Sequence, residues 1–176
     1  MVFSETRLKG AYIIEIEKRE DNRGFFARTW CQREFVLHKL NPHVVQSNMS
    51  FNIKKGTLRG LHYQAASHAE TKLIRCVKGS IYDVIVDLRS DSPTYAQYFS
   101  AELSAENYRM LYVPVYFAHG FMTLEDNTEV VYQVSEYYAP ESERGIRWND
   151  PAFQIKWPSN VKVISDKDAS WPDYRA

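Results

Sequence analysis

The segment "GTLRGLHYQ" (56–64) places a cation, Arg59, and an imidazole, His62, in a stretch that otherwise has the composition of a β-strand. A surface hairpin with two satisfied polar side chains would explain them, and a lone strand histidine is more often packed or hydrogen-bonded than catalytic. On the wall of a pocket, the same residues would act as a general base and an anion-binding cation.

Strand alternation places two further chemical groups on faces that look inward. In "TEVVYQVSE" (128–136), Tyr132 shares its face with two valines, and in "TKLIRC" (71–76) Lys72 shares its face with Ile74 and Cys76. An inward tyrosine is usually a core residue with a satisfied hydroxyl group. An inward lysine is different, because burying an ammonium without a partner is costly, so Lys72 is expected to face a ligand or a fixed carboxylate.

The same alternation separates the first two candidates. Leu58, Gly60 and His62 share one face of their strand, whereas Arg59 falls on the opposite face. A glycine inside a strand often marks a bulge or bend, and a bulge at Gly60 would bring Arg59 and His62 together.

Strand signals dominate the elements that must position these residues. Runs rich in Val, Ile, Tyr, Phe and Thr predict strands at 12–17, 43–50, 71–77, 80–88, 94–103, 110–115 and 128–138. One helix is predicted at 31–40, ended by Asn41-Pro42. Many short strands without a βαβ rhythm predict an all-β antiparallel sandwich or barrel with few short helices, as a single domain over 1–176. The polar tail from Trp157 is expected to wrap the outside of a sheet or to reach across its mouth.

Composition excludes several classes of protein. The chain has 176 residues, 44% of them hydrophobic, which is typical of a globular domain. Lys+Arg and Asp+Glu both number 22, so no global basic field favours nucleic acid or a membrane surface. No apolar stretch is long enough to span a membrane, and no secretion signal is recognisable. Cys31 and Cys76 form no disulfide framework or metal-type spacing, and a cytoplasmic location is expected.

Taken together, several segments resemble the dTDP-4-dehydrorhamnose 3,5-epimerase family. The most specific are "LRGLHYQ", "DVIVDLRSDSPTY", "AHGF" and "WNDP", and with "DNRGFFART", "VQSNMS" and "SDKD" they follow the family's order over nearly the whole chain. The resemblance implies a cupin jelly roll, no metal or other cofactor, and a homodimer with strands exchanged between subunits. It also implies a nucleotide-diphosphate-linked 4-keto-6-deoxy sugar as substrate.

The resemblance also implies roles for individual residues. His62 would be the general base, Asp168 the carboxylate that orients it, and Tyr132 the general acid, while Lys72 and Arg59 would face the 4-keto oxygen and nearby phosphate. The remaining positions expected to contact the substrate are Arg23, Arg28, Gln46, Asn48, His119, Glu143 and Lys167, with Tyr138 stacking on the nucleobase.

Arg28 departs from the family pattern. The family's "RGFF" segment usually continues to a glutamate two residues after the second phenylalanine, and this chain has Arg28 there. A hydrogen-bond acceptor has become a cation, which leaves open the nucleotide (dTDP, CDP or GDP), the sugar, and whether C3, C5 or both are inverted. If Arg28 changes a ligand contact, the thymidine rhamnose precursor is not the best substrate; if it turns to solvent, the preference is unaffected.

Some of these residues are also compatible with two other functions. A metal-dependent cupin such as an oxygenase would use His62, His68, Glu70 and His119, but Gln64 occupies the second position of the usual HxH pair and Lys72 would repel a cation. A sugar-nucleotide-binding cupin without catalysis is the second rival. The complete set of base, acid, carboxylate and cation argues against it.

Overall fold

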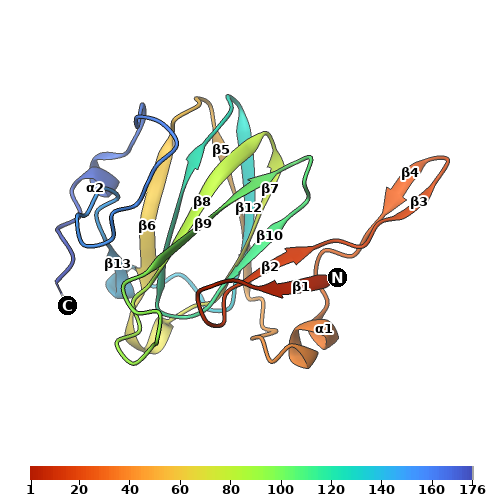
Figure 1. The fold of residues 1–176 in the computed structure, drawn as a ribbon, viewed down its shortest axis with the longest axis horizontal. Coiled ribbons are helices and arrows are strands. Elements are labelled where there is room, and N and C mark those ends of the chain that lie inside the picture. The colour runs from red at the N-terminus through yellow and green to blue at the C-terminus, as the bar shows by residue number, and fades with distance from the viewer. Residues whose placement is uncertain (176) are drawn as a thin grey trace.

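Two antiparallel β-sheets packed face to face form the body of the protein (Figure 1), in a computed structural model that describes residues 1–175. The first sheet has the spatial order β1 (Val2–Glu5), β2 (Tyr12–Glu15), β10 (Met110–Val113), β7 (Lys72–Lys78), β12 (Thr128–Val134) and β5 (Gln46–Asn52). The second has the order β13 (Glu143–Gly145), β6 (Leu58–Gln64), β11 (Phe117–Thr123), β8 (Ser80–Asp87) and β9 (Tyr98–Ser104). The predicted all-β sandwich is confirmed.

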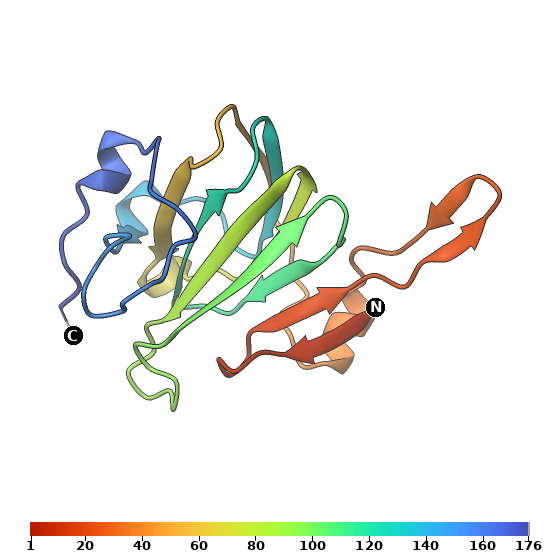
Figure 2. The same ribbon diagram turned by 45° about the horizontal axis from the view of Figure 1, so that its top comes forward.

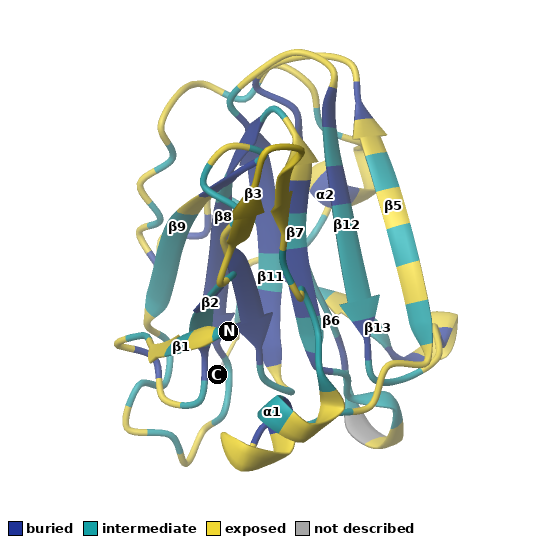
Figure 3. Cartoon of the chain, turned by 90° about the vertical axis from the view of Figure 1, so that its right-hand side faces the viewer, coloured by how far each residue is buried: buried dark blue, intermediate teal, exposed yellow. Residues whose placement is uncertain are grey.

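The main hydrophobic core lies between the two sheets. Its buried members come from both sheets, among them Ile74, Leu111 and Val130 on one side and Ile85 and Phe117 on the other. Burying each of these side chains contributes about 1.5–3 kcal/mol to folding. Figure 3 shows β8 buried along most of its length, whereas the edge strand β5 alternates between exposed and half-buried residues. Strand β5 therefore has the alternation of a half-solvated strand, and β8 that of a buried one.

The outer face of each sheet has its own cover. The short helix α1 (Gln32–Leu37) packs Phe35 against Ile14, Leu73 and Met110 of the first sheet. The segment after β13 runs along the outside of the second sheet, where Ile146 and Phe153 join a cluster with strand residues such as Leu61, Val84 and Val86. Within that segment lies helix α2 (Asp166–Ala169), next to β6 in Figures 1 and 2. The expectation that the tail wraps a sheet is confirmed.

A two-stranded hairpin stands apart from the sandwich. Strands β3 (Arg19–Asp21) and β4 (Gly24–Phe26) pair only with each other, and Figures 1 and 2 show them projecting away from both sheets. Every residue of the two strands is exposed, including Phe26 at 65%. The hairpin's shape therefore comes mainly from its own ladder, and Phe25 packs edge-to-face on Tyr108 of the body, with ring centroids 5.1 Å apart.

Several element boundaries differ from the sequence expectation. The helix expected over 31–40 covers only Gln32–Leu37, and Lys39 has a φ of 59°, which ends the helical path. The strand expected from residue 94 begins at Tyr98, because the chain first turns through Ala96 at a φ of 58°. Strand β11 runs through "FAHGFMT", and the 3₁₀ turns Ala66–His68 and Pro140–Ser142 link strands nearby.

None of the described helices is long and apolar enough to cross a bilayer.

Candidate active site

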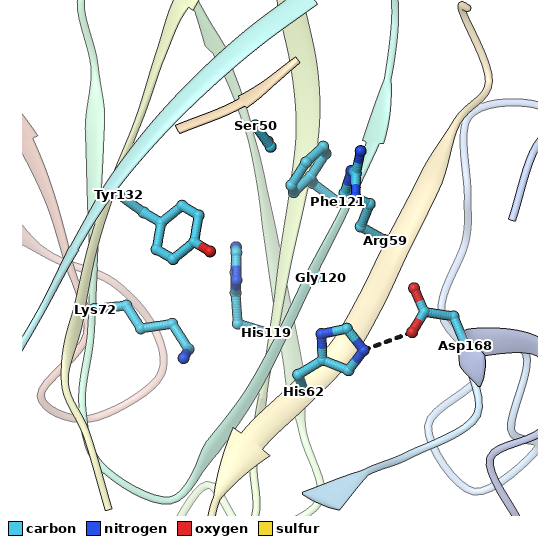
Figure 4. Close-up of a pocket in the computed structure, with 9 residues that line it drawn as sticks. All are labelled: Ser50, Arg59, His62, Lys72, His119, Gly120, Phe121, Tyr132 and Asp168. Atoms are coloured by element: carbon cyan, nitrogen blue, oxygen red, sulfur yellow. Dashed lines mark hydrogen bonds and ion pairs between the residues drawn. The ribbon is translucent and has the colours of Figure 1, made fainter. Parts of the chain in front are cut away.

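One pocket opens between the two sheets and is bordered by residues from both (Figure 4). The inner pocket is lined by Ser50, Arg59, His62, Lys72, His119, Gly120, Phe121, Tyr132 and Asp168. An outer pocket shares His62, Lys72 and Tyr132 with it and extends to Gln46, Asn48, Glu70, Tyr138 and Glu143. The two pockets therefore form one continuous cleft, and most of the site residues predicted from the sequence border it.

A bulge in β6 places Arg59 and His62 on the same wall. In the β6–β11 pair, His119 lies opposite His62 and Phe121 lies opposite Arg59, so three steps on β6 match two steps on β11. The extra residue falls at Gly60, whose φ of 116° favours glycine and where an added Cβ would lie 2.6 Å from the Gly120 Cα. The bulge predicted at Gly60 is confirmed, and it removes the conflict with strict alternation.

His62 is held by a carboxylate that approaches from outside the sheet. Its Nε2 lies 2.6 Å from Asp168 Oδ1, and we assign the shared proton to Nε2, because a carboxylate accepts. The backbone N–H of Gly60 donates to Asp168 Oδ2 at 3.1 Å. Burial by itself would raise the pKa of the Asp168 carboxyl, but these hydrogen bonds outweigh burial and hold the pKa below its usual value. Asp168 is therefore an ionised acceptor, and His62 Nδ1 carries the free lone pair.

Helix α2 brings Asp168 to this position. Ser165 caps the helix by accepting a hydrogen bond from the Asp168 N–H at 3.1 Å. Trp171 follows the helix and packs its ring edge-to-face with His62, with the centroids 6.2 Å apart. A Cβ at Gly145 would lie 2.2 Å from the Trp171 ring, so a glycine on β13 makes room for the indole.

Tyr132 and Lys72 extend from the opposite sheet. Tyr132 stands on β12 and Lys72 on β7, and Figure 4 shows both side chains reaching toward the space in front of His62. Burial raises the pKa of the Tyr132 phenol, and the nearby Glu70 carboxylate raises it further. Lys72 forms an ion pair with Glu70, whose side chain is only 10% exposed. Lys72 thus has the fixed carboxylate that its inward position predicted.

Arg59 is also held in place before any ligand arrives. Its Nε donates to Asn52 Oδ1 at 2.7 Å, and the Asn52 amide donates in turn to the Thr128 carbonyl at 3.2 Å. Asn52 is buried at 2% exposure. Two of the five N–H groups of Arg59 contact Asn52 and the Phe51 carbonyl, so the rest of the guanidinium remains available to an anion.

A second group of predicted residues meets at the mouth of the cleft. Tyr138 donates its hydroxyl proton to Glu143 at 2.7 Å, and Lys167 donates to the same carboxylate at 2.6 Å. Gln46 accepts a hydrogen bond from the Tyr138 N–H at 2.9 Å. Tyr138 is 57% exposed, so its side chain is accessible from the mouth of the cleft.

The structure does not bring Arg23 and Arg28 to this cleft. Arg23 lies in the turn of the projecting hairpin and pairs with Asp21 at 2.6 Å. Arg28 follows β4, is 58% exposed, and lies 3.8 Å from Glu34. Both side chains are therefore mainly exposed to solvent, away from the cleft of their own chain.

Sequence reasoning missed three residues that line the inner pocket, Ser50, Gly120 and Phe121, and the buried Asp83 behind it. Ser50 lines the inner pocket with a buried hydroxyl that has no partner among residues 1–175, and Asp83 bonds His119 from behind. A signal for Asp83 existed, because "SIYDVIVDL" places a carboxylate on the inward face of an apolar strand. The metal-site alternative receives no support from geometry: His68 bonds Ser142 at 2.9 Å, and no group of three His, Cys, Asp or Glu side chains suited to a metal occurs in the described part of the chain.

Comparison with known proteins matches this picture. The family model described as dTDP-4-dehydrorhamnose 3,5-epimerase matches residues 5–176. A dTDP-4-dehydrorhamnose 3,5-epimerase from Sinorhizobium fredii is 42% identical over 173 residues, covering 98% of this chain and 89% of that protein.

Solved structures agree over the whole length. The enzyme of that name from Elizabethkingia anophelis superposes with a TM-score of 0.96 at 40% identity, covering 99% of this chain and 96% of that one. The Bacillus anthracis enzyme, solved with TDP and PPi bound, gives 0.95 at 43% identity, covering 98% and 99%. The chain therefore belongs to the dTDP-4-dehydrorhamnose 3,5-epimerase family, has its cupin jelly-roll fold, and is an isomerase of the carbohydrate-epimerase type.

Proposed function

We propose that the protein inverts C3 and C5 of a nucleotide-diphosphate-linked 4-keto-6-deoxy sugar, with His62 as base and Tyr132 as acid. The observation that carries the proposal is that His62 and Tyr132 come from opposite sheets and face one pocket. Inversion requires a proton to leave from one face of the carbon and to return on the other. Two groups on opposite walls meet that requirement.

His62 is suited to remove the proton. A C–H bond next to a ketone is weakly acidic, and its deprotonation leaves an enolate. An imidazole with an ordinary pKa near 6.5 accepts such a proton at neutral pH. The ionised Asp168 behind it fixes the tautomer with Nδ1 free and stabilises the imidazolium that forms.

Tyr132 and Lys72 complete the proton transfer. The raised pKa of Tyr132 keeps the phenol protonated, so the group has a proton to deliver. Lys72 offers an ammonium to the developing enolate oxygen, and removal of one such donor commonly costs a hundredfold or more in rate, on the order of 3 kcal/mol. On ligand entry, the keto oxygen would share the ammonium with Glu70.

The rest of the cleft fits a nucleotide diphosphate. Arg59 is held by Asn52 with N–H groups to spare, and Tyr138 presents an open ring at the mouth, beside Glu143 and Lys167. The related Bacillus anthracis structure contains TDP and PPi. We therefore propose that the diphosphate binds near Arg59 and that the nucleobase stacks on Tyr138. The protein has no net charge, so local cations such as Arg59 would have to hold the diphosphate.

Solvent exchange tests the proposal directly. The protein is incubated in D₂O with dTDP-, CDP- and GDP-linked 4-keto-6-deoxyglucose, and deuterium is located at C3 and C5 by NMR. Deuterium at both carbons with inverted product is expected, and the His62→Asn variant serves as the control for background enolisation. Binding without deuterium incorporation would instead identify a non-catalytic sugar-nucleotide protein.

Arg28 tests the nucleotide or sugar preference. We expect Arg28→Glu, which restores the family acceptor, to move kcat/KM toward the dTDP-linked rhamnose precursor. If the wild type already prefers that substrate and the variant ratio does not change, Arg28 is a solvated side chain only.

We further propose a homodimer in which the β3–β4 hairpin of one subunit reaches the cleft of the other. The hairpin projects away from its own sandwich, and it carries Arg23 and leads to Arg28 outside their own pocket. Strand β5 is an edge strand, and its Met49 and Phe51 are exposed at 64% and 50%. Apolar side chains on an exposed edge strand are expected where a second subunit covers that edge.

Complementation tests the exchange. His62→Asn and Arg23→Ala subunits are each expected to be impaired, whereas a refolded mixture of the two contains hybrid dimers with one intact site. If hairpins are exchanged, activity should recover to about a quarter of the wild-type value, because about half the dimers are hybrids with one of two sites intact. If confirmed hybrids recover no activity, the hairpin contributes to the site of its own subunit or to no site, and the proposed exchange is wrong.

A further inference from the structure

The cleft contains a second histidine–carboxylate pair that the proposed proton transfer does not use. His119 Nε2 lies 2.7 Å from Asp83 Oδ1. His119 and His62 are direct partners across the β6–β11 ladder, and both line the inner pocket. Each imidazole is thus backed by one carboxylate, His62 from outside the sheet and His119 from inside the sandwich.

Asp83 is placed where a carboxylate is expensive. It is 0% exposed on β8, and its inward neighbours on that strand, Ile81 and Ile85, belong to the main core. Its second oxygen, Oδ2, is buried and has no hydrogen-bond partner among residues 1–175. Replacing such a group by an apolar residue often stabilises a protein, so packing alone does not account for a carboxylate here.

The pair constrains which nitrogen of His119 meets a ligand. The Nε2 atom of His119 is directed at the Asp83 carboxylate, and no described protein group bonds its other ring nitrogen, Nδ1. The His119 side chain is 11% exposed, and Figure 4 shows the ring at the centre of the inner pocket. A carboxylate at Nε2 stabilises the proton on that nitrogen, which leaves Nδ1 as a lone-pair acceptor.

We propose that Asp83 is a positioning residue that fixes His119 as the Nε2–H tautomer, so that Nδ1 accepts a hydrogen bond from a hydroxyl group of the bound sugar. The inference deepens the proposed function by assigning the acceptor that selects a hydroxylated sugar next to the reacting carbons. Asp83 acts only through His119 and touches no substrate atom itself.

The first test does not depend on the substrate. In ¹⁵N-histidine-labelled protein without ligand, long-range ¹H–¹⁵N correlation spectra should show His119 as the Nε2–H tautomer. Asp83→Asn should change this pattern, because the amide N–H₂ can donate to Nε2 and move the proton to Nδ1. A wild-type His119 protonated on Nδ1 alone would overturn the proposal, whether or not the variant folds and whether or not the proposed reaction is correct.

The second test is a double-mutant cycle with dTDP-4-keto-6-deoxyglucose. Asp83→Asn should lower kcat/KM by at least about tenfold in the wild-type background and have no further effect in a His119→Gln background. Asp150→Asn is the matched control, because Asp150 is also buried, at 2%, but bonds the backbone of Ala152 and Tyr174 away from the cleft. Additive losses from Asp83→Asn and His119→Gln, or a changed His119 tautomer in Asp150→Asn, would show that Asp83 acts through general packing.

Discussion

The two histidine–aspartate pairs of the cleft use the same residue types in opposite environments. Asp168 comes from helix α2 and accepts hydrogen bonds at both oxygens, from His62 and from the Gly60 N–H. Asp83 lies inside the sandwich with one oxygen bonded to His119 and the other without a described partner. The pKa of Asp168 is lowered because its hydrogen bonds outweigh burial, whereas burial dominates for Asp83 and raises its pKa despite His119.

We expect the environment of the carboxylate, more than the pairing itself, to determine the role of each histidine. A well-bonded Asp168 can remain ionised if His62 gains a proton, as the proposed role of base requires. Asp83 has no second donor to stabilise its charge, so its pair is better suited to hold one tautomer than to store a transferred proton. Four predictions test this division.

His62→Asn should have the largest effect. It removes the imidazole whose carboxylate is bonded at both oxygens, and we expect deuterium incorporation at both carbons to fall to background, on the order of 10⁴-fold. Circular dichroism should show an intact fold. Near-normal exchange in the folded variant would transfer the role of base to another group, His119 first.

Asp168→Asn should come next, with a loss of roughly a thousandfold in kcat. The amide can still bond His62, but it favours the wrong tautomer and no longer stabilises the imidazolium. The loss should exceed that of Asp83→Asn by at least about tenfold. Equal losses would mean that the two pairs are not functionally distinct.

Tyr132→Phe should separate exchange from inversion. Without the phenol, His62 can still remove and return a proton on its own face, so some deuterium should enter while inversion falls about a hundredfold. The measurement is the ratio of deuterium incorporated to product inverted. Epimerisation at the wild-type rate would remove Tyr132 from the role of acid and make His119 the alternative donor.

The smallest effects concern stability, and they should have opposite pH dependence. The folded pKa of Asp168 is lowered, so its contribution to stability is present above the unfolded pKa near 3.9 and is lost as the pH falls toward the folded value. The stability deficit of Asp168→Asn should therefore shrink in acid.

For Asp83 the sign reverses. Its folded pKa is raised, so the native state holds the proton more tightly and the contribution of Asp83 to stability decreases as the pH rises from about 3.9 through the folded value. Asp83→Asn should gain stability relative to the wild type over that window. Urea unfolding between about pH 3 and pH 7 measures both variants, and slopes of the same sign would contradict the contrast.

The strand-rich class of the fold and several members of the site could be predicted from the residue pattern alone. Alternation placed Tyr132 and Lys72 on inward faces, and both line the inner pocket. The short-range pattern sufficed because the side-chain period of a strand is local. The segment 56–64 indicated His62 as a candidate base, and the motif resemblance added Asp168; in the structure the two side chains meet at 2.6 Å.

How these residues meet follows from strand pairing and from packing between distant segments. The bulge at Gly60 is visible only in the β6–β11 register, and Asp168 reaches His62 from 106 positions away along the chain. Asp83 meets His119 because β8 and β11 pair side by side. These contacts depend on strand register and on packing between distant segments. The alternation of side chains along one strand gives no information about either.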